Sequence, residues 1–188
     1  ILIRKTVIVA ILAASVGYSL MSFIMTATPL QIVNVCKLGD SASATVIQWH
    51  VIAMFAPSFF TGSVINFLGN RKVMIIGVIL YIISICVGVM GKSIEYFWIS
   101  LFLCGLGWNF LYVGGSDIIA KSSLPEERAK VQGVTDFIIF IFVASGSFLA
   151  GILHNNLGWE IMMFYTSIPI FILFLSIVFI NTREMRTI

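Results

Sequence analysis

The chain has 188 residues, of which 60% are hydrophobic and 10% are charged, and its mean hydropathy is +1.08. Because an ordinary soluble domain contains about 25% charged residues, this composition excludes a disordered chain, a soluble enzyme domain and a nucleic-acid-binding domain. The net charge of +3 does not indicate a polyanionic partner, since the basic residues are spread over short turns instead of forming one patch.

Six stretches are long and apolar enough to cross a lipid bilayer as helices. A helix rises 1.5 Å per residue and needs about 20 residues to cross a hydrocarbon layer of about 30 Å. In chain order, the predicted spans are 6–28, 44–67, 73–91, 95–117, 131–153 and 160–180. Turn-forming residues separate them. The sequence therefore predicts an all-α polytopic membrane protein in which residues 1–188 form one six-helix transmembrane domain.

The connections between the predicted spans carry very different numbers of basic residues. Because six spans return the chain to its starting side, residues 1–5, 68–72, 118–130 and 181–188 share one side. They contain nine of the eleven Lys and Arg residues, and the other side contains only Lys37 and Lys92. Basic residues concentrate in cytoplasmic loops. We therefore expect an integral membrane protein, in a bacterial inner membrane, with both termini of this segment in the cytoplasm.

The sequence contains no recognisable disulfide, metal-binding or catalytic motif. Cys36, Cys86 and Cys104 are odd in number and show no C-x-x-C spacing, so they predict neither a disulfide framework nor a metal site. No G-x-S-x-G, H-E-x-x-H or Walker A pattern occurs. We expect no catalytic residues, no metal and no cofactor, and a protein that is not an enzyme. The chain begins without an initiator Met or a signal peptide, which we interpret as a piece of a longer protein.

Polar and small residues lie at helical spacing on the first and fourth predicted spans, whereas the third and sixth are apolar on all faces. The stripe on the first span is Ser15, Tyr18, Ser22 and Thr26, and the stripe on the fourth is Gly105, Asn109, Tyr112 and Ser116. Residues spaced in this way share one face of a helix. We expect the first, second, fourth and fifth spans to face protein or water, and the third and sixth to face lipid.

The second and fifth spans contain residues that bend a helix or bring helices together. Pro57 removes a backbone hydrogen bond near the middle of the second span and is expected to kink it, and Pro29 is expected to bend the first helix as it leaves the membrane. Gln48 and His50 lie near one end of the second span. His50 is expected to be packed, with proton coupling as the less favoured alternative. In the fifth span, small residues four apart (146 and 150, 147 and 151) predict close helix contact.

Two connections carry a family resemblance. Residues 62–72 read GSVINFLGNRK, which resembles the G-x-x-x-D-x-x-G-x-R-K loop that joins the second and third helices of each half in the major facilitator superfamily. The PEER turn at 125–128, followed by Gly133, resembles the loop between the fourth and fifth helices of a half. The stretches 26–30, 47–62, 105–115 and 127–137 are similar to one group of bacterial permeases in that superfamily. The resemblance covers roughly residues 4–181 and departs from the loop motif at Asn66, which stands where the motif has Asp.

The resemblance implies a fold and a function. The six spans would be the C-terminal half of a twelve-helix transporter, built as two inverted three-helix repeats, and the missing N-terminal six-helix half would be their partner. The whole protein would be a permease that carries a small organic solute by secondary active transport with alternating access, with a proton as the coupling ion, as a symporter or antiporter. Its other partner would be the lipid bilayer, without any nucleic acid. The alternatives are a dimeric six-helix channel or facilitator, and a membrane scaffold that does not transport.

The candidates for a solute-binding cavity are polar and aromatic residues of the first, second and fourth predicted spans. They are Tyr18, Ser22, Thr26, Gln48, Trp108, Asn109 and Tyr112. Trp offers a stacking face, and Asn offers both a donor and an acceptor. The alternative for these residues is hydrogen bonding and packing between helices.

The candidates for gating or ion coupling lie near the basic side. They are Asn66, Arg71, Lys72, Asp117, Arg128 and Asp136. A carboxylate inside a span should be paired, protonated or in contact with water. The alternatives are that Arg71 and Lys72 only set the topology, that Asp117 forms an ion pair with loop residues, and that Asp136 pairs with Arg128 or Lys130.

Overall fold

The computed structural model describes residues 4–179, and in this range the chain is helical apart from short connections. The elements are α1 (Lys5–Pro29), the π-helix η1 (Leu30–Val35), α2 (Asp40–Phe55), α3 (Ser58–Leu68), α4 (Asn70–Met90), α5 (Ile94–Ser122), α6 (Arg128–Leu157) and α7 (Trp159–Phe179). Five of the spans are long and apolar enough to cross a membrane: α1 with η1, α4, α5, α6 and α7. The sixth consists of α2 and α3, which meet at a bend of 44°. The expected all-α fold of six apolar spans is confirmed.

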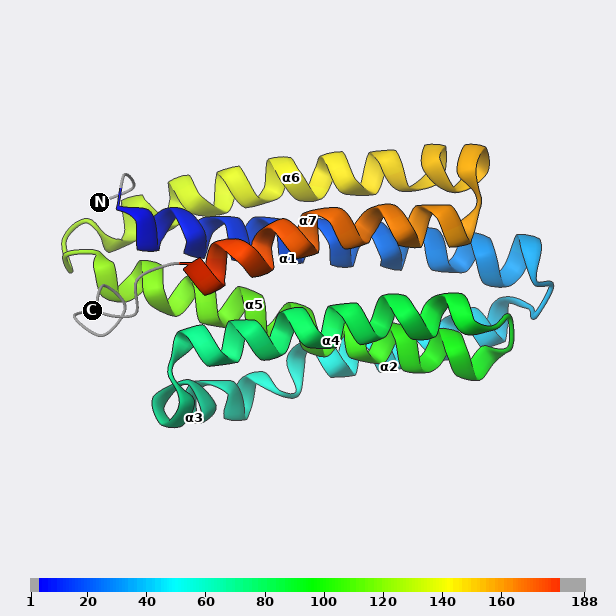
Figure 1. Cartoon of the computed structure of the whole chain (residues 1–188), viewed down its shortest axis with the longest axis horizontal. Helices are drawn as coiled ribbons and strands as arrows, with labels where there is room; N and C mark the ends of the chain where they lie inside the picture. The colour runs from blue at the N-terminus through cyan, green and yellow to red at the C-terminus, as the bar shows by residue number, and fades with distance from the viewer. Residues whose placement is uncertain (1–3, 180–188) are drawn as a thin grey trace.

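The spans run back and forth between two ends of an elongated bundle (Figure 1). One end, called here the α3 end, contains the start of α1, α3, and the connection between α5 and α6. The opposite end, called the η1 end, contains η1 and the connections from α4 to α5 and from α6 to α7. Lys37 and Lys92 therefore lie at the η1 end. The α3 end holds Arg4, Lys5, Arg71, Lys72, Lys121, Arg128 and Lys130, whereas Arg183 and Arg186 lie outside the described residues.

The first span continues beyond its predicted end at residue 28. Pro29 is the last residue of α1, and the chain then widens into the π-helix η1. The N–H of Cys36 donates to the carbonyl of Gln31 at 2.8 Å, a bond that spans five residues. Proline lacks an N–H and disturbs the turn before it, and the wider turn begins directly after Pro29. Pro29 thus changes the type of helix without ending the span.

The second span is interrupted where the sequence predicts a kink. The N–H groups of Phe60 and Thr61 both donate to the carbonyl of Pro57 at 2.8 Å, so the ladder of hydrogen bonds restarts after the proline. The break separates α2 from α3 and directs α3 away at 44°. The predicted kink at Pro57 is confirmed.

The packing order follows the pattern of two related three-helix units. α1 and α5, the first span of each unit, pack against each other at the centre. α2, the second span of the first unit, packs against α5, and α6, the second span of the second unit, packs against α1. Each unit therefore places its second span on the other unit's first span, which is the exchange expected of a pair of repeats.

Small residues bring the central helices together. A Cβ atom on Gly107 would lie 2.9 Å from the carbonyl oxygen of Gly77, and one on Gly77 would lie 3.0 Å from the carbonyl oxygen of Gly107. On the other side of α5, a Cβ on Gly115 would lie 2.7 Å from the carbonyl oxygen of Ala10. Backbones approach this closely only where side chains are small. The glycines of α5 therefore let α4 and α1 contact its two sides.

The expectation that the third span is apolar on all faces is wrong for α4. The hydroxyl of Tyr81, on α4, donates to the carbonyl of Gly17 at 2.6 Å. Ser84 and Ser100 each donate to the other's carbonyl oxygen, at 2.7 and 2.8 Å. These hydroxyls are buried, and they hold α4 against α1 and α5 because polar groups in an apolar interior need partners.

Large apolar side chains are strongly exposed on α3 and α6. They include Phe59, Phe60 and Phe67 on α3 and Phe137, Phe140 and Phe148 on α6. α6 is also the span with the smallest buried share, although its sequence predicts contact with protein or water. The bundle described here therefore leaves one face of α6 and most of α3 without a protein partner.

Candidate functional site

An aromatic cluster lies where four spans meet at mid-length. Tyr18 on α1 contacts Trp108 and Tyr112 on α5, with ring centres 5.0 and 5.6 Å apart. Trp108 and Tyr112 stack almost parallel, with ring centres 5.2 Å apart and planes 10° apart. Phe55 on α2 contacts Trp108 at 5.8 Å, and Phe140 on α6 lies 6.0 Å from Tyr18. Aromatic rings pair favourably at these separations.

The cluster is buried on one side and open on the other. Trp108 is only 4% exposed, whereas Phe55 and Phe140 are 56% and 55% exposed. Tyr18 and Tyr112 are half-buried. Because α1 and α5 lie at the centre of the bundle, their rings form the base of the cluster, and Phe55 and Phe140 flank it on either side. The open side presents the faces and edges of these rings to whatever lies beside the bundle.

Polar atoms beside the rings remain without partners. The Nε1–H of Trp108 and the hydroxyl of Ser116 are buried and make no hydrogen bond within the described residues. Ser116 lies eight residues after Trp108 on α5, about two turns along the same face. Buried polar groups are nearly always paired, so an unpaired one needs an explanation. A ligand with acceptor groups near the rings could pair with them.

Asn109, beside Trp108 in sequence, is fully committed to contacts within the protein. It is 0% exposed, and its amide nitrogen donates to the carbonyl of Met54 at 2.7 Å and to the hydroxyl of Ser58 at 2.6 Å. Its amide oxygen accepts from the hydroxyl of Thr61 at 2.6 Å. These partners lie on both sides of the break between α2 and α3. Asn109 therefore fixes the bend, and its side chain does not reach the open side of the cluster.

Serines join α1 to α6 next to the aromatic cluster. The hydroxyls of Ser22 and Ser147 are 2.6 Å apart, and the hydroxyl of Ser19 donates to the carbonyl of Phe142 at 2.8 Å. A Cβ on Gly146 would lie 2.6 Å from Ser19 Oγ and 2.8 Å from its carbonyl oxygen. The close contact predicted at residue 146 is present, and Ser22 contributes to it.

The remaining cavity candidates differ in exposure. Thr26 and Gln48 are exposed and have no side-chain hydrogen bond within the described residues. Gln48 lies seven residues before Phe55, on the same face of α2. His50, in contrast, is 0% exposed, and its Nδ1 lies 2.7 Å from the carbonyl oxygen of Leu101. His50 is a packed residue between α2 and α5, as expected.

At the α3 end, two of the gating candidates form defined contacts, Arg71 between helices and Asp117 with a residue one turn along its own helix. Arg71 donates through Nε to the carbonyl of Ile177 at 3.2 Å and through its guanidinium to the carbonyl of Val178, so it caps the end of α7. Asp117 forms an ion pair with Lys121, 2.7 Å between Oδ2 and Nζ. Basic side chains stabilise the free carbonyls at the C-terminus of a helix. Arg71 therefore does more than mark the topology.

Asn70 is the polar residue of the motif loop that contacts Asp117. Its amide nitrogen donates to Asp117 Oδ2 at 2.8 Å and to the carbonyl of Gly114 at 2.9 Å. It follows Gly69, whose φ of 84° lies in the left-handed region and turns the chain from α3 directly into α4. Asn66, where the family motif has Asp, is exposed. The contact to α5 is thus made four residues further along than the motif position indicates.

The other gating candidates lie in the open. Lys72 and Arg128 are exposed, and in residues 4–179 the ion pairs are Lys121–Asp117 and Lys92–Glu160. Asp136 is half-exposed and accepts a hydrogen bond from Gln132 Nε2 at 2.9 Å. The alternative that Asp136 pairs with Arg128 or Lys130 is wrong, because a residue one turn away on the same helix takes that role.

Several residues that form contacts in the structure were not among the sequence-based candidates, including Gln31 and His154, which contact each other at the η1 end. Phe55 and Phe140 look like ordinary apolar residues of a span, and nothing in their spacing marks them. Asn70 could have been found from its place after a turn glycine, at the first residue of a helix. Gln31 and His154 are single polar residues near the ends of apolar spans, and each could have been examined as half of a pair.

The fold and the cluster define a membrane-embedded helical bundle that presents aromatic and polar groups at mid-membrane depth, a form typical of one wall of a solute transporter. Residues 4–187 match the family model described as Major Facilitator Superfamily, and the chain belongs to this family of membrane transporters. The expectation that the chain belongs to a family of non-enzymatic membrane transporters is therefore confirmed.

Other members of this family align with most of the chain. It is 42% identical to the riboflavin transporter RfnT of Brucella anthropi over 153 residues, which are 81% of this chain and 38% of that protein. It is 33% identical to the MFS-type transporter YdeG of Bacillus subtilis over 154 residues, which are 80% of this chain and 35% of that protein. The structure of a D-xylose–proton symporter superposes on 97% of this chain and 49% of that chain, with a TM-score of 0.77 and 15% identity.

The chain spans about half the length of these relatives, or less. The likeness to the symporter establishes the fold alone. The solute, the coupling ion and the second six-helix unit are therefore properties of the whole protein.

Proposed function

We propose that this chain forms one wall of a carrier that moves a small organic solute across a bacterial inner membrane by alternating access. The single observation that carries the proposal is the aromatic cluster. It lies midway along four spans, it is open on one side, and it includes the unpartnered N–H of Trp108. Solute sites of such carriers lie near the bilayer midplane between two helical units.

A second six-helix unit is the partner that completes the path. Phe55 on α2 and Phe140 on α6 flank the cluster and are exposed, so this face combines aromatic rings with the unpartnered N–H of Trp108, a polar group that lipid would not satisfy. The basic residues at the α3 end favour that end as the cytoplasmic one. In that orientation the motif loop, Arg71 and Asp117 lie at the inner mouth, and the η1 end lies outside.

The solute is proposed to carry a planar ring. The stacked pair of Trp108 and Tyr112, with Tyr18 edge-on to both, suits a flat heterocycle better than a flexible chain. The relative at 42% identity is a riboflavin transporter, and the flavin ring system is planar and rich in hydrogen-bond acceptors. Riboflavin is therefore the first solute to test. Ser22, Thr26 and Gln48 are proposed to line the path on either side of the rings, with Asn109 setting the bend of the second span.

Proton coupling is proposed with Asp136 as one candidate carrier of the proton. Asp136 lies on α6, four residues before Phe140 of the cluster, and it is half-exposed. A carboxylate at this depth has to be solvated, paired or protonated.

The test is binding and uptake of riboflavin by the whole carrier. Purified carrier is titrated with riboflavin, and uptake is measured in vesicles with and without a pH gradient. Trp108→Ala and Tyr112→Ala should abolish saturable binding. The matched control is Trp98→Ala, because Trp98 lies outside the cluster and stacks on Phe102 and against Trp49.

Each outcome decides one part of the proposal. Binding that Trp98→Ala preserves and Trp108→Ala removes supports the aromatic site. Equal effects of the two substitutions would overturn it. Uptake that Asp136→Asn leaves unchanged at every pH gradient would remove Asp136 from the coupling role.

A further inference from the structure

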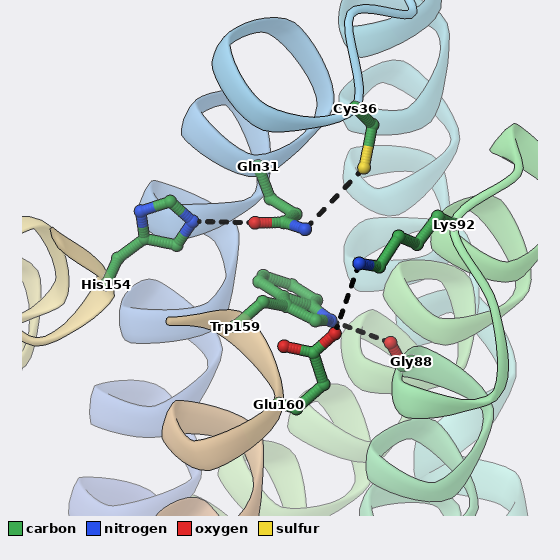
Figure 2. A network of polar contacts seen from close by, with 7 residues as sticks. All are labelled: Gln31, Cys36, Gly88, Lys92, His154, Trp159 and Glu160. Atoms are coloured by element: carbon green, nitrogen blue, oxygen red, sulfur yellow. Dashed lines mark hydrogen bonds and ion pairs between the residues drawn. The ribbon is translucent and has the colours of Figure 1, made fainter. Parts of the chain in front are cut away.

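A buried histidine at the η1 end links two spans through one glutamine. Figure 2 shows His154, near the end of α6, pointing toward Gln31 of η1, with its Nε2 at 2.9 Å from Gln31 Oε1. The other end of the Gln31 side chain donates from Nε2 to Cys36 Sγ at 3.5 Å. His154 and Gln31 are 6% and 3% exposed. The contact therefore lies inside the protein, although it sits near the end of both spans.

The contact with Gln31 determines which ring nitrogen of His154 carries the proton. Gln31 Oε1 can only accept, so Nε2 of His154 must carry the proton and donate. The second ring nitrogen, Nδ1, is buried and has no hydrogen-bond partner within the described residues. A neutral imidazole fits this position with Nδ1 bare. A second proton at Nδ1 would give that nitrogen an N–H without an acceptor within the described residues.

The segment that receives the bond is a π-helix. η1 contains Gln31 and follows Pro29, and its hydrogen bonds span five residues, as in Cys36 N–H to the carbonyl of Gln31. Turns of this kind are rare and occur often at functional sites. The segment that His154 holds therefore departs from regular α-helical geometry at the η1 end.

Neighbouring contacts at this end do not depend on a buried charge. The Nε1–H of Trp159 donates to the carbonyl of Gly88 at 2.7 Å and joins α7 to α4. Lys92 and Glu160 form an ion pair of 3.7 Å between side chains that are 68% and 56% exposed, and such surface pairs contribute little. Of the contacts in Figure 2, the one between α6 and η1 is the one that protonation of a buried group can change.

Other ionisable groups near His154 are few. The segments packed against α6 carry, toward this end, Cys36 and Lys37 after η1, Glu160 and Tyr165 on α7, and Glu95 and Tyr96 on α5. Glu160 is paired with Lys92, and Glu95 accepts a hydrogen bond from Ser93. A proton on His154 therefore has no carboxylate already bonded to its ring.

We propose that His154 is a proton-binding latch of the η1 end. In the neutral form it joins α6 to η1 and keeps this end closed. Proton uptake at Nδ1 creates a second N–H that has no acceptor in the closed form, so opening of this end, which lets water reach the ring, becomes favoured. The proposal rests on the proposed function only in calling the η1 end one mouth of a path. Histidine changes its charge between about pH 5 and pH 8, so this latch would respond to an acidic medium at that mouth.

Cys36 provides a built-in reporter of opening. It is half-buried and bonded to Gln31, so release of Gln31 should expose its thiol. The whole carrier, with its other cysteines replaced by serine or alanine, is labelled with a membrane-impermeant maleimide at both ends of that pH range. His154→Gln is labelled in parallel. At each pH the labelling rate of the protein with His154 is divided by the labelling rate of His154→Gln, and this ratio removes the intrinsic pH dependence of the thiol.

The latch predicts that this ratio rises several-fold from the alkaline to the acidic end of the range. Gln31→Leu, which removes the acceptor, should label rapidly at both pH values. His50→Gln is the matched control, because His50 is also buried but bonds to a carbonyl on α5, and its labelling should follow that of the unchanged protein. A constant ratio, or slow labelling of Gln31→Leu, would overturn the latch.

The labelling result can be distinguished from a failure of folding and from a failure of solute binding. Size-exclusion profiles verify the fold of each variant, and Gln31→Leu decides the outcome if His154→Gln does not fold. The labelling needs no solute, so a carrier that fails to bind riboflavin and still shows the rise would refute the solute assignment while supporting the latch.

Discussion

Asn109 on α5 donates a hydrogen bond of 2.7 Å to the carbonyl oxygen of Met54, across the point where Pro57 interrupts the second span. Proline cannot supply an N–H to the preceding turn, and a free carbonyl inside a membrane is costly. The helix restarts at Ser58, which leaves the Met54 carbonyl outside the backbone ladder, and a side chain from a different span supplies a donor to it. The bend between α2 and α3 is therefore specified jointly by a proline in one span and an amide in another.

Replacing Asn109 by Ala should destabilise the bundle. The change leaves the Met54 carbonyl without its side-chain donor, and an unsatisfied buried group costs about 1–3 kcal/mol, whereas the Thr61 hydroxyl keeps its bond to the Pro57 carbonyl. The midpoint of thermal unfolding in detergent should fall markedly. Asn66→Ala is the matched control, because Asn66 is exposed. Equal midpoints for the two variants would show that the amide does not support the bend.

Gly146→Ala should force α1 and α6 apart. The new Cβ would lie 2.8 Å from the carbonyl oxygen of Ser19, which is backbone and cannot rotate away. Overpacking of this kind costs about 1–3 kcal/mol. Gly151→Ala, one turn further along α6, meets nothing within 4 Å and should leave the unfolding midpoint unchanged. A loss of stability in both variants would point to helix flexibility as the cause.

Arg71→Gln should loosen the end of α7. The guanidinium bonds to the carbonyls of Ile177 and Val178 would be lost, at a cost of about 1–2 kcal/mol. Amide hydrogen exchange should accelerate in the last turn of α7, since that turn loses its cap. Lys72→Gln removes a similar charge from the neighbouring exposed position and should leave the exchange unchanged. The prediction fails if the two variants exchange alike.

Trp108→Phe separates stacking from hydrogen bonding at the proposed solute site. Phenylalanine keeps a ring against Tyr18 and Tyr112 and removes the unpartnered Nε1–H. If that N–H binds the solute, Kd should rise by about 2–10-fold, the equivalent of one neutral hydrogen bond. Titration of the purified carrier measures this. An unchanged Kd would assign Trp108 to stacking alone.

The six spans could be predicted from the sequence because the length of an apolar run is a local property. Their ends could not, since helices continue past the hydrocarbon layer wherever backbone bonds remain available. Pro29 illustrates the limit. Its ring was expected to bend the helix at the membrane surface, whereas the structure widens the turn and continues to Val35.

The aromatic residues at the base of the candidate site could be predicted from the sequence, whereas the residues at its sides could not. Tyr18, Trp108 and Tyr112 lie on stripes with polar and small neighbours, which marks the face of a helix that avoids lipid. Phe55 and Phe140 each share a helix face with too few polar residues, Gln48 and Asp136 among them, to form a stripe. They join the cluster only because α2 and α6 pack against opposite sides of the central pair of helices.

By itself, the sequence determined a six-span helical protein with alternate turns of opposite basic content, and the two faces most suited to a solute. Composition, run length and helical period carry that information within each segment. Only the tertiary structure decided which polar atoms are used up in holding helices together, as in Asn109, and which remain free, as in Trp108. The physical reason is that a hydrogen bond depends on the position of a partner tens of residues away, which no local spacing specifies.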